Sequence, residues 1–183
     1  MTRHEEASTL LVFASSLGWI ALRAAGKIVK GLAFGHPEAQ SAEAVIGNGL
    51  RPSDPADWWQ RSIVLRLQAF AEGVPMDFRD IAIDPGASTP FRRRVLRQCR
   101  EIGYGETVSY AELAVRAGSP GAARAVGNCM ATNPVPLLIP CHRVLPAHGA
   151  PGHFSAPGGT EMKRRLLLLE SPVGWAMPTT PRC

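Results

Sequence analysis

A proline-stiffened apolar run, residues 133–144 (NPVPLLIPCHRV), constrains the fold of this chain more than any other stretch. Its three prolines fix φ and remove backbone donors, so the run cannot be the interior of a helix or a central strand. We interpret it as a rigid, buried connection that holds Cys141 at a set depth. Because apolar surroundings raise the pKa of a thiol, a nucleophilic Cys141 would need a base, and His142 is the first candidate. A buried structural cysteine is the alternative.

The composition is typical of a soluble globular protein, with 45% hydrophobic and 19% charged residues over 183 residues. No apolar run approaches the roughly 20 residues that cross a bilayer, and the first residues lack a signal-peptide pattern. We therefore expect a cytoplasmic protein with no membrane partner. The four cysteines show no zinc-finger spacing, so we expect free thiols, no metal and no cofactor.

The net charge of +5 is concentrated in the second half of the chain. Residues 91–183 contain 12 Lys/Arg and 5 Asp/Glu, whereas residues 1–90 contain 8 and 10. This asymmetry indicates that the second half meets a polyanion. Charge alone leaves DNA, RNA and the absence of any partner open.

The first half predicts a small α+β domain over residues 1–86. Apolar, β-favouring segments at 9–13, 19–23 and 27–34, separated by turn-like residues, predict a three-stranded antiparallel meander. Helices are expected over 37–46 and 55–72, the second capped by Asp54 and buried through five residues, Trp58, Ile63, Leu65, Leu67 and Phe70. One more strand is expected over 78–84, before a turn-rich break at 84–88. Nothing in this domain indicates catalysis, so we interpret it as structural.

The second half, residues 87–183, predicts a mainly helical domain with a helix-turn-helix. Thr89 caps a helix to about Cys99, whose arginines we interpret as a solvated face. A capping box of Ser109 and Glu112 starts a helix to about 116, and a Gly-containing turn leads to a second helix over 121–130. That helix has one long side chain, Arg124, which suits the minor groove better than base readout in the major groove.

A final helix is predicted over 161–170, before a loose tail at 171–183. Its basic residues, Lys163, Arg164 and Arg165, are expected outside, and its four consecutive leucines are expected to pack inward.

Four motifs together resemble the O6-alkylguanine-DNA alkyltransferases, also called methylated-DNA–protein-cysteine methyltransferases. The resemblance covers residues 88–170 and rests on Val108-Ser109-Tyr110, Arg124-Ala125-Val126-Gly127, Asn133-Pro134-Val135-Pro136 and Pro140-Cys141-His142-Arg143-Val144. It implies a ribonuclease H-like N-terminal domain. It also implies direct-reversal DNA repair, in which Cys141 takes an alkyl group from O6-alkylguanine in duplex DNA in one irreversible step.

The resemblance also implies a role for each site residue. His142 would draw the proton from Cys141 through a water, Glu170 would orient His142, and Asn133 would brace the turn that carries the cysteine. Tyr110 would donate its hydroxyl to the departing guanine.

The resemblance further implies how the DNA is bound. The lesion would be flipped out of the duplex. Arg124 would fill the vacated stack, with further DNA contacts from Ser119 and Ala125. The substrate pocket would be formed by Met130, Pro136, Val144, Phe154 and Ser155. The implied partner is double-stranded DNA that carries O6-alkylguanine or O4-alkylthymine, bound by a monomer.

Three other functions remain open from the residues themselves. A lesion-binding relative without transfer activity would share the fold, but the cysteine at the acceptor position favours transfer. A transcriptional regulator would need more polar side chains on its second helix. In a cysteine hydrolase, a histidine directly after the cysteine would not easily reach the facing geometry that acyl transfer requires.

Overall fold

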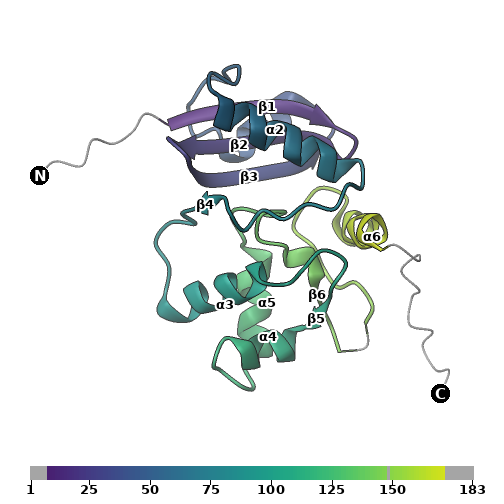
Figure 1. Cartoon of the computed structure of the whole chain (residues 1–183). Coiled ribbons are helices and arrows are strands. Elements are labelled where there is room, and N and C mark those ends of the chain that lie inside the picture. The colour runs from purple at the N-terminus through teal and green to yellow at the C-terminus, as the bar shows by residue number, and fades with distance from the viewer. Residues whose placement is uncertain (1–7, 148, 172–183) are drawn as a thin grey trace, which may run out of the picture. The chain divides into compact units, whose positions relative to one another are not determined.

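The computed structural model of the chain describes residues 8–147 and 149–171 and divides into two compact units. The first unit ends at Gly86 and also includes Pro134–Pro136, and the second contains the rest of the chain. The fold is a mixed α+β fold, with a sheet and helices in the first unit and mainly helices in the second (Figure 1).

The sheet of the first unit contains four strands in sequential order, β1 (Ser8–Ser15), β2 (Gly18–Ala25), β3 (Ile28–His36) and β4 (Ala82–Ile83). The first three pair antiparallel, which confirms the predicted meander. The fourth is shorter than the strand predicted over 78–84, because a turn closed by Ile81 N–H and the Phe78 carbonyl at 3.1 Å precedes it. Since β4 pairs parallel with β3, the sheet is mixed. The Leu32 N–H of β3 also donates to the Pro134 carbonyl at 2.9 Å.

Two helices complete the first unit, α1 (Ala39–Ile46) and α2 (Trp58–Ala71). The predicted Asp54 cap is wrong, since the Asp57 carboxylate accepts from the Gln60 N–H at 2.8 Å and the helix starts at Trp58. The predicted burial of Trp58 and Leu65 is also wrong, because these residues are 78% and 64% exposed. The buried residues of α2 follow helical spacing, so Trp58 and Leu65 lie off the buried stripe. The buried residues are Gln60, Ile63, Leu67, Phe70 and Ala71.

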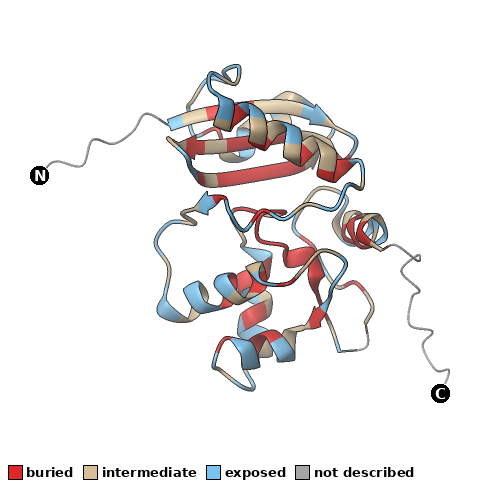
Figure 2. Cartoon of the chain, viewed as in Figure 1, coloured by how far each residue is buried: buried red, intermediate tan, exposed pale blue. Residues whose placement is uncertain are grey.

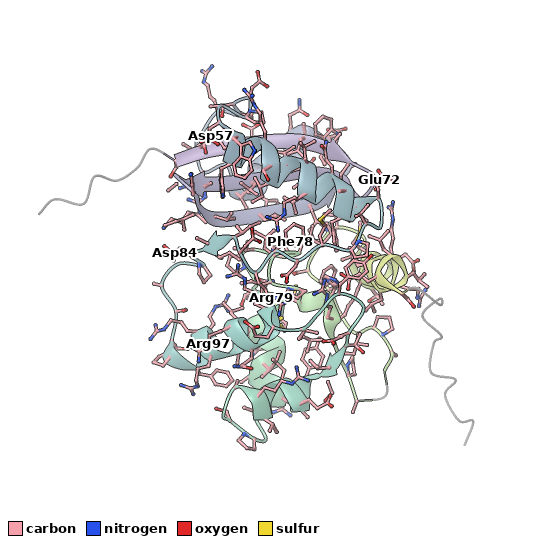
Figure 3. All side chains as sticks on the ribbon, viewed as in Figure 1. Asp57, Glu72, Phe78, Arg79, Asp84 and Arg97 are labelled. Atoms are coloured by element: carbon pink, nitrogen blue, oxygen red, sulfur yellow. The ribbon has the colours of Figure 1, made fainter. Side chains whose placement is uncertain are left out.

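The strands bury both of their faces. Leu10 and Ala21 pack with Ala42 of α1, and Leu11 is buried on the opposite face, which α2 crosses in Figure 1. Figure 2 shows β3 buried along most of its length. Phe70 of α2 meets Phe78 edge to face at 5.9 Å between ring centroids, and Figure 3 marks Phe78 in the segment before β4.

The second unit contains four helices of four residues or more, α3 (Pro90–Arg100), α4 (Tyr110–Arg116), α5 (Ala123–Ala131) and α6 (Gly159–Glu170), in the described part of the chain. The Thr89 cap and the capping box of Ser109 and Glu112 are confirmed. Two short strands, β5 (Val108–Ser109) and β6 (Val144–Leu145), pair parallel. They bring the start of α4 beside the end of η1 (Cys141–Arg143), a single 3₁₀ turn. Residues 172–183 of the predicted tail lie outside the described residues.

The prediction of which α6 residues are exposed and which are buried is partly wrong. The Lys163 side chain is buried, whereas Leu168 is 47% exposed. The buried positions follow helical spacing rather than residue polarity: Lys163, Leu166, Leu167 and Glu170. Two charged residues of α6 are therefore buried. Within the described ranges, no helix is long and apolar enough to cross a membrane.

Candidate active site

Cys141 lies on the 3₁₀ turn that ends the proline-rich run. Its N–H donates to the Ile139 carbonyl at 2.8 Å, and the Asn133 side-chain amide donates to the same carbonyl at 2.8 Å. Asn133 also hydrogen-bonds the Cys141 thiol. Between these two residues Leu137 adopts a left-handed conformation with φ of 69°, which a leucine rarely occupies. The loop is thus closed at its base by Asn133 and bent at Leu137, and it presents the thiol in a buried position.

A buried charged cluster lies behind the cysteine and is centred on Glu170, the last residue of α6. Glu170 Oε1 lies 2.8 Å from His142 Nε2, and Arg143 Nε and Nη2 donate to the two carboxylate oxygens at 2.8 Å each. Arg143 Nη1 also donates to the Ile102 carbonyl at 2.6 Å. The bidentate arginine gives the carboxylate a fixed orientation. Since the carboxylate accepts from Nε2–H, Nδ1 of His142 carries the lone pair when the ring is neutral.

The pKa values in this cluster set the resting protonation states of the thiol and the histidine. Burial lowers the pKa of His142, although the hydrogen bond that its ring donates to the Glu170 carboxylate opposes this shift, so the ring is neutral near pH 7. Burial favours a higher pKa for Glu170, but His142 and Arg143 outweigh it and lower this pKa to about 2. Burial raises the pKa of the Cys141 thiol, while Asn133 and the Lys163 ammonium oppose the rise. The site therefore holds a protonated thiol with a neutral base in the next residue.

Gly105 completes the cluster through its backbone. Its N–H donates to Glu170 Oε2 at 3.1 Å, its φ is +75°, and a Cβ at this position would lie 2.9 Å from the Glu170 carbonyl oxygen. A side chain here would strain the backbone and push against Glu170.

We expect Gly105→Ala to destabilise the second unit by about 2 kcal/mol, from the left-handed φ and the contact with Glu170 together. Gly118→Ala is the matched control, because Gly118 has φ of +69° and a Cβ added there would meet no atom within 4 Å. Urea unfolding of both variants measures the difference. Equal losses of unfolding free energy in the two variants would show that the contact between the added Cβ and the Glu170 carbonyl oxygen does not destabilise the fold.

A cavity of about 300 Å³ opens beside the thiol. Its lining comes from α4, α5, η1, α6 and the loop before α6, and it includes Tyr110, Met130, Cys141, Phe154, Ser155 and Lys163. Gly127, Ala131, Pro146, Gly152 and His153 complete it. The walls are mostly apolar, which favours a flat, poorly hydrated ligand. Its volume lies at the lower end of the range for small-molecule pockets.

Lys163 brings a positive charge to this apolar cavity. Its Nζ donates to the Val144 carbonyl at 2.6 Å and lies 5.7 Å and 6.0 Å from the ring centroids of Tyr110 and Phe154. Burial lowers the pKa of Lys163 to about 8, against the opposing influence of Cys141 and Cys99. Burial likewise raises the pKa of Tyr110, so its hydroxyl remains a proton donor. The ammonium can therefore stabilise negative charge that forms in the cavity.

The structure brings most of the predicted site residues together and leaves others apart. Cys141, His142, Glu170 and Asn133 form one connected group, and Tyr110, Met130, Phe154 and Ser155 line the cavity beside it. Pro136 groups with the first unit, and Val144 contributes its carbonyl to Lys163; neither is among the described residues that line the cavity. The predicted DNA contacts lie on α5 and the turn before it, with Arg124 and Ala125 exposed and Ser119 half-buried.

Sequence reasoning missed three functional residues: Arg143, Lys163 and Gly105. Arg143 directly follows the Cys-His pair, which was a usable signal for a partner of the same carboxylate. Lys163 lies seven residues before Glu170, and this spacing places both on one face of α6. Nothing in the sequence around Gly105 distinguishes it from an ordinary turn glycine.

The chain is similar to known proteins over both its sequence and its fold. Residues 90–172 match the family model described as "6-O-methylguanine DNA methyltransferase, DNA binding domain". A methylated-DNA–protein-cysteine methyltransferase of Mus musculus is 54% identical over 111 residues, which cover 60% of this chain and 51% of that protein. The methylated-DNA–protein-cysteine methyltransferase of Mycolicibacterium paratuberculosis is 45% identical over 107 residues, which cover 58% of this chain and 62% of that protein. The chain thus aligns with little more than half the length of these curated relatives.

Solved structures match over nearly the whole chain. The crystal structure of the O6-methylguanine methyltransferase of Mycobacterium tuberculosis is 32% identical with a TM-score of 0.74, and the match covers 90% of this chain and 93% of that one. The structure of the M. tuberculosis protein in complex with DNA is 32% identical with a TM-score of 0.68, and the match covers 88% and 92%. The similarity therefore includes the first unit as well as the second.

Proposed function

The chain belongs to the methylated-DNA–protein-cysteine methyltransferase family, and we propose that it repairs O6-alkylguanine in duplex DNA by transferring the alkyl group to Cys141. The observation that carries this proposal is the buried thiol beside a neutral histidine that is held by Glu170, at the edge of an apolar cavity. The proposal extends to O4-alkylthymine, whose alkyl group is likewise bonded to an exocyclic oxygen of the base.

The transfer begins with deprotonation of the thiol. The proton leaves Cys141 Sγ for Nδ1 of His142 through a water, and the Glu170 carboxylate stabilises the imidazolium that forms. Arg143 keeps Glu170 ionised, because its guanidinium donates a hydrogen bond to each of the two carboxylate oxygens. The Lys163 ammonium stabilises the thiolate. Asn133 holds the sulfur in place by its hydrogen bond.

The thiolate then attacks the alkyl carbon in line with the carbon–oxygen bond. A sulfur–carbon bond forms as the bond to O6 breaks, and the electron pair of that bond remains on the guanine. Tyr110 donates a hydrogen bond from its hydroxyl to the ring as negative charge develops there, and the ammonium of Lys163 beside Tyr110 supports this donation. The proton held by His142 balances the charge of the departing guanine. The product thioether has no leaving group that would restore the thiol. Each molecule therefore acts once.

The two helices α4 and α5, joined by the turn over residues 117–122, support a helix-turn-helix in the DNA contact. α5 presents Arg124 and Ala125 on an exposed, otherwise small-residue surface, which allows close approach to a minor groove. For the first unit we keep the ribonuclease H-like assignment as part of the proposal, supported by its strand meander and flanking helices.

The experiment that tests this function is a single-turnover assay on duplex DNA with one O6-methylguanine. Digestion of the DNA after the reaction should recover one unmodified guanine per protein molecule and no more, however long the incubation. Cys141→Ser should bind the duplex and restore none. Recovery of several guanines per protein molecule would contradict a single-use acceptor.

We expect Arg124→Ala to lower transfer from duplex O6-methylguanine by at least about 10-fold, since flipping a base costs a few kcal/mol that an inserted side chain offsets. Transfer from free O6-benzylguanine, which needs no flipping, should stay within about twofold of wild type. Single-turnover rates on both substrates measure this, with Arg116→Ala as an exposed basic control on α4. Equal proportional losses on both substrates would show that Arg124 supports the pocket rather than base extrusion.

A further inference from the structure

Two arginines of α3 bind the C-terminal ends of the two helices that carry the proposed DNA contact. Arg94 Nε donates to the carbonyl of Ala117, the C-cap residue of α4, at 3.0 Å. Arg92 donates from Nη1 to Thr132 Oγ1 and from Nη2 to the Thr132 carbonyl, both at 2.5 Å, and Thr132 is the C-cap residue of α5. The last carbonyls of a helix have no partner within the helix and carry partial negative charge, so a guanidinium there is favourable. The arginine run is therefore not simply a solvated face.

Arg92 makes the more consequential of these contacts, because Thr132 directly precedes the acceptor loop. The Thr132 hydroxyl donates back to the Asn128 carbonyl at 2.9 Å, so one side chain connects α5 to the guanidinium. The next residue is Asn133, which closes the acceptor loop on Ile139 and hydrogen-bonds the Cys141 thiol. Arg92 thus binds the peptide unit where the helix that carries Arg124 ends and the loop that carries Cys141 begins.

The guanidinium of Arg92 makes a contact that a simple positive charge could not make. Its two terminal nitrogens reach a hydroxyl and a carbonyl of one residue, a two-point contact that fixes the direction of the chain as well as its position. A lysine at this position would keep the charge but could not span both oxygens.

We propose that Arg92 is a positioning residue that, through Thr132, sets Asn133 and the acceptor thiol relative to the helix that enters DNA. This proposal rests on the proposed alkyl transfer to Cys141. The competing interpretation is that the half-buried Arg92 is a phosphate contact like other basic residues of the second unit. The two interpretations differ in the effect of an arginine-to-lysine change.

The first test measures single-turnover transfer at saturating O6-methylguanine duplex for Arg92→Lys, Arg92→Ala, Thr132→Val and the double variant Arg92→Ala/Thr132→Val. We expect both Arg92 variants to lose about 10-fold in the saturated rate, and Thr132→Val about threefold, because the carbonyl contact survives it. The double variant should be no slower than Arg92→Ala within about twofold, as expected for residues in one contact. Arg97→Ala, an exposed arginine of the same helix marked in Figure 3, is the control and should transfer at the wild-type rate.

A second test needs no DNA. The rate at which iodoacetamide modifies Cys141, followed by peptide mass, should rise with pH at a more alkaline midpoint in Arg92→Lys than in wild type. The reason is that a displaced Asn133 no longer supports the thiolate. A general loosening of the fold would instead speed the modification at every pH.

The proposal is overturned if Arg92→Lys transfers at the wild-type saturated rate and Arg92→Ala loses only affinity for DNA. In that case the salt dependence of DNA binding by Arg92→Ala would fall by about one unit of slope, as expected for a lost phosphate contact. It is also overturned if the iodoacetamide profile does not move, or if the losses in the double variant are additive. Wild-type protein that transfers nothing would contradict the proposed function itself. The iodoacetamide test would still decide the role of Arg92 in that case.

Discussion

Glu170→Gln is expected to lower the free energy of unfolding by about 3 kcal/mol and to slow alkyl transfer by about 100-fold. The amide keeps the shape of the carboxylate but leaves the buried Arg143 guanidinium without a counter-charge. It also removes the charge that stabilises protonated His142, so the thiol loses an effective base. Urea unfolding measures the first effect, and single-turnover transfer at saturating duplex measures the second.

The matched control is Glu161→Gln on the same helix. Glu161 pairs with Arg164 at 2.9 Å, but its side chain is 73% exposed, so we expect a loss below about 0.5 kcal/mol and an unchanged transfer rate. An unchanged single-turnover rate in Glu170→Gln would remove Glu170 from the mechanism, whatever happens to stability.

The pH dependence of stability follows from the same carboxylate. In the folded protein its pKa is lowered to about 2 from an ordinary value of 4.5. The contribution of Glu170 is therefore complete above its unfolded pKa and is lost as the pH falls toward 2, with a total of roughly 3 kcal/mol. Wild type should lose stability faster than Glu170→Gln across this acid range. Parallel unfolding curves from about pH 6 to about pH 2 would contradict this assignment.

Lys163→Met is expected to slow transfer by about 10-fold near pH 7 and to stabilise the fold by about 1 kcal/mol. The ammonium is buried and helps the thiolate to form, but its burial costs stability, which shows as a pKa lowered to about 8. Methionine removes that cost and fills the same space, although the Val144 carbonyl loses its donor. Activity and stability should therefore change in opposite directions.

The pH dependence separates this electrostatic role from a packing role. In the folded protein Lys163 loses its proton as the pH rises through about 8, so the rate advantage of wild type over Lys163→Met should shrink above that pH. The stability advantage of the variant should shrink over the same range, because the buried charge disappears from the wild type. Arg164→Met, a partly exposed change on α6, serves as control. A rate ratio that stays constant from about pH 6 to about pH 10 would indicate lost packing.

The sequence predicted those parts of the molecule that local rules determine. The strand meander follows from short β-favouring segments with turn residues between them, and the Thr89 cap and the Ser109–Glu112 box follow from side chains that satisfy helix ends. The rigid loop around Cys141 follows from its prolines. Each of these depends on neighbours within a few residues.

The errors arise where distant contacts outweigh local character. The charge of Lys163 predicts an outer position, but the stripe shared with Leu166, Leu167 and Glu170 buries it. The apolar side chain of Leu65 predicts an inner position, but Leu65 lies between Ile63 and Leu67 in the chain and so on the opposite side of α2. The partner of Arg92 could not be predicted from its neighbours, because Thr132 is 40 residues away in sequence.

The central claim is that Cys141 accepts the alkyl group, and intact-protein mass spectrometry after incubation with a duplex that contains O6-methylguanine tests it most directly. We predict a gain of one methyl group per molecule, which peptide mapping places on Cys141, and no gain for Cys141→Ala under the same conditions. Cys99 and Cys129 serve as internal controls, since both are buried free thiols of the same chain. A methyl group on either of those residues, or an unchanged mass after the lesion has been repaired, would contradict the assignment of Cys141 as the acceptor.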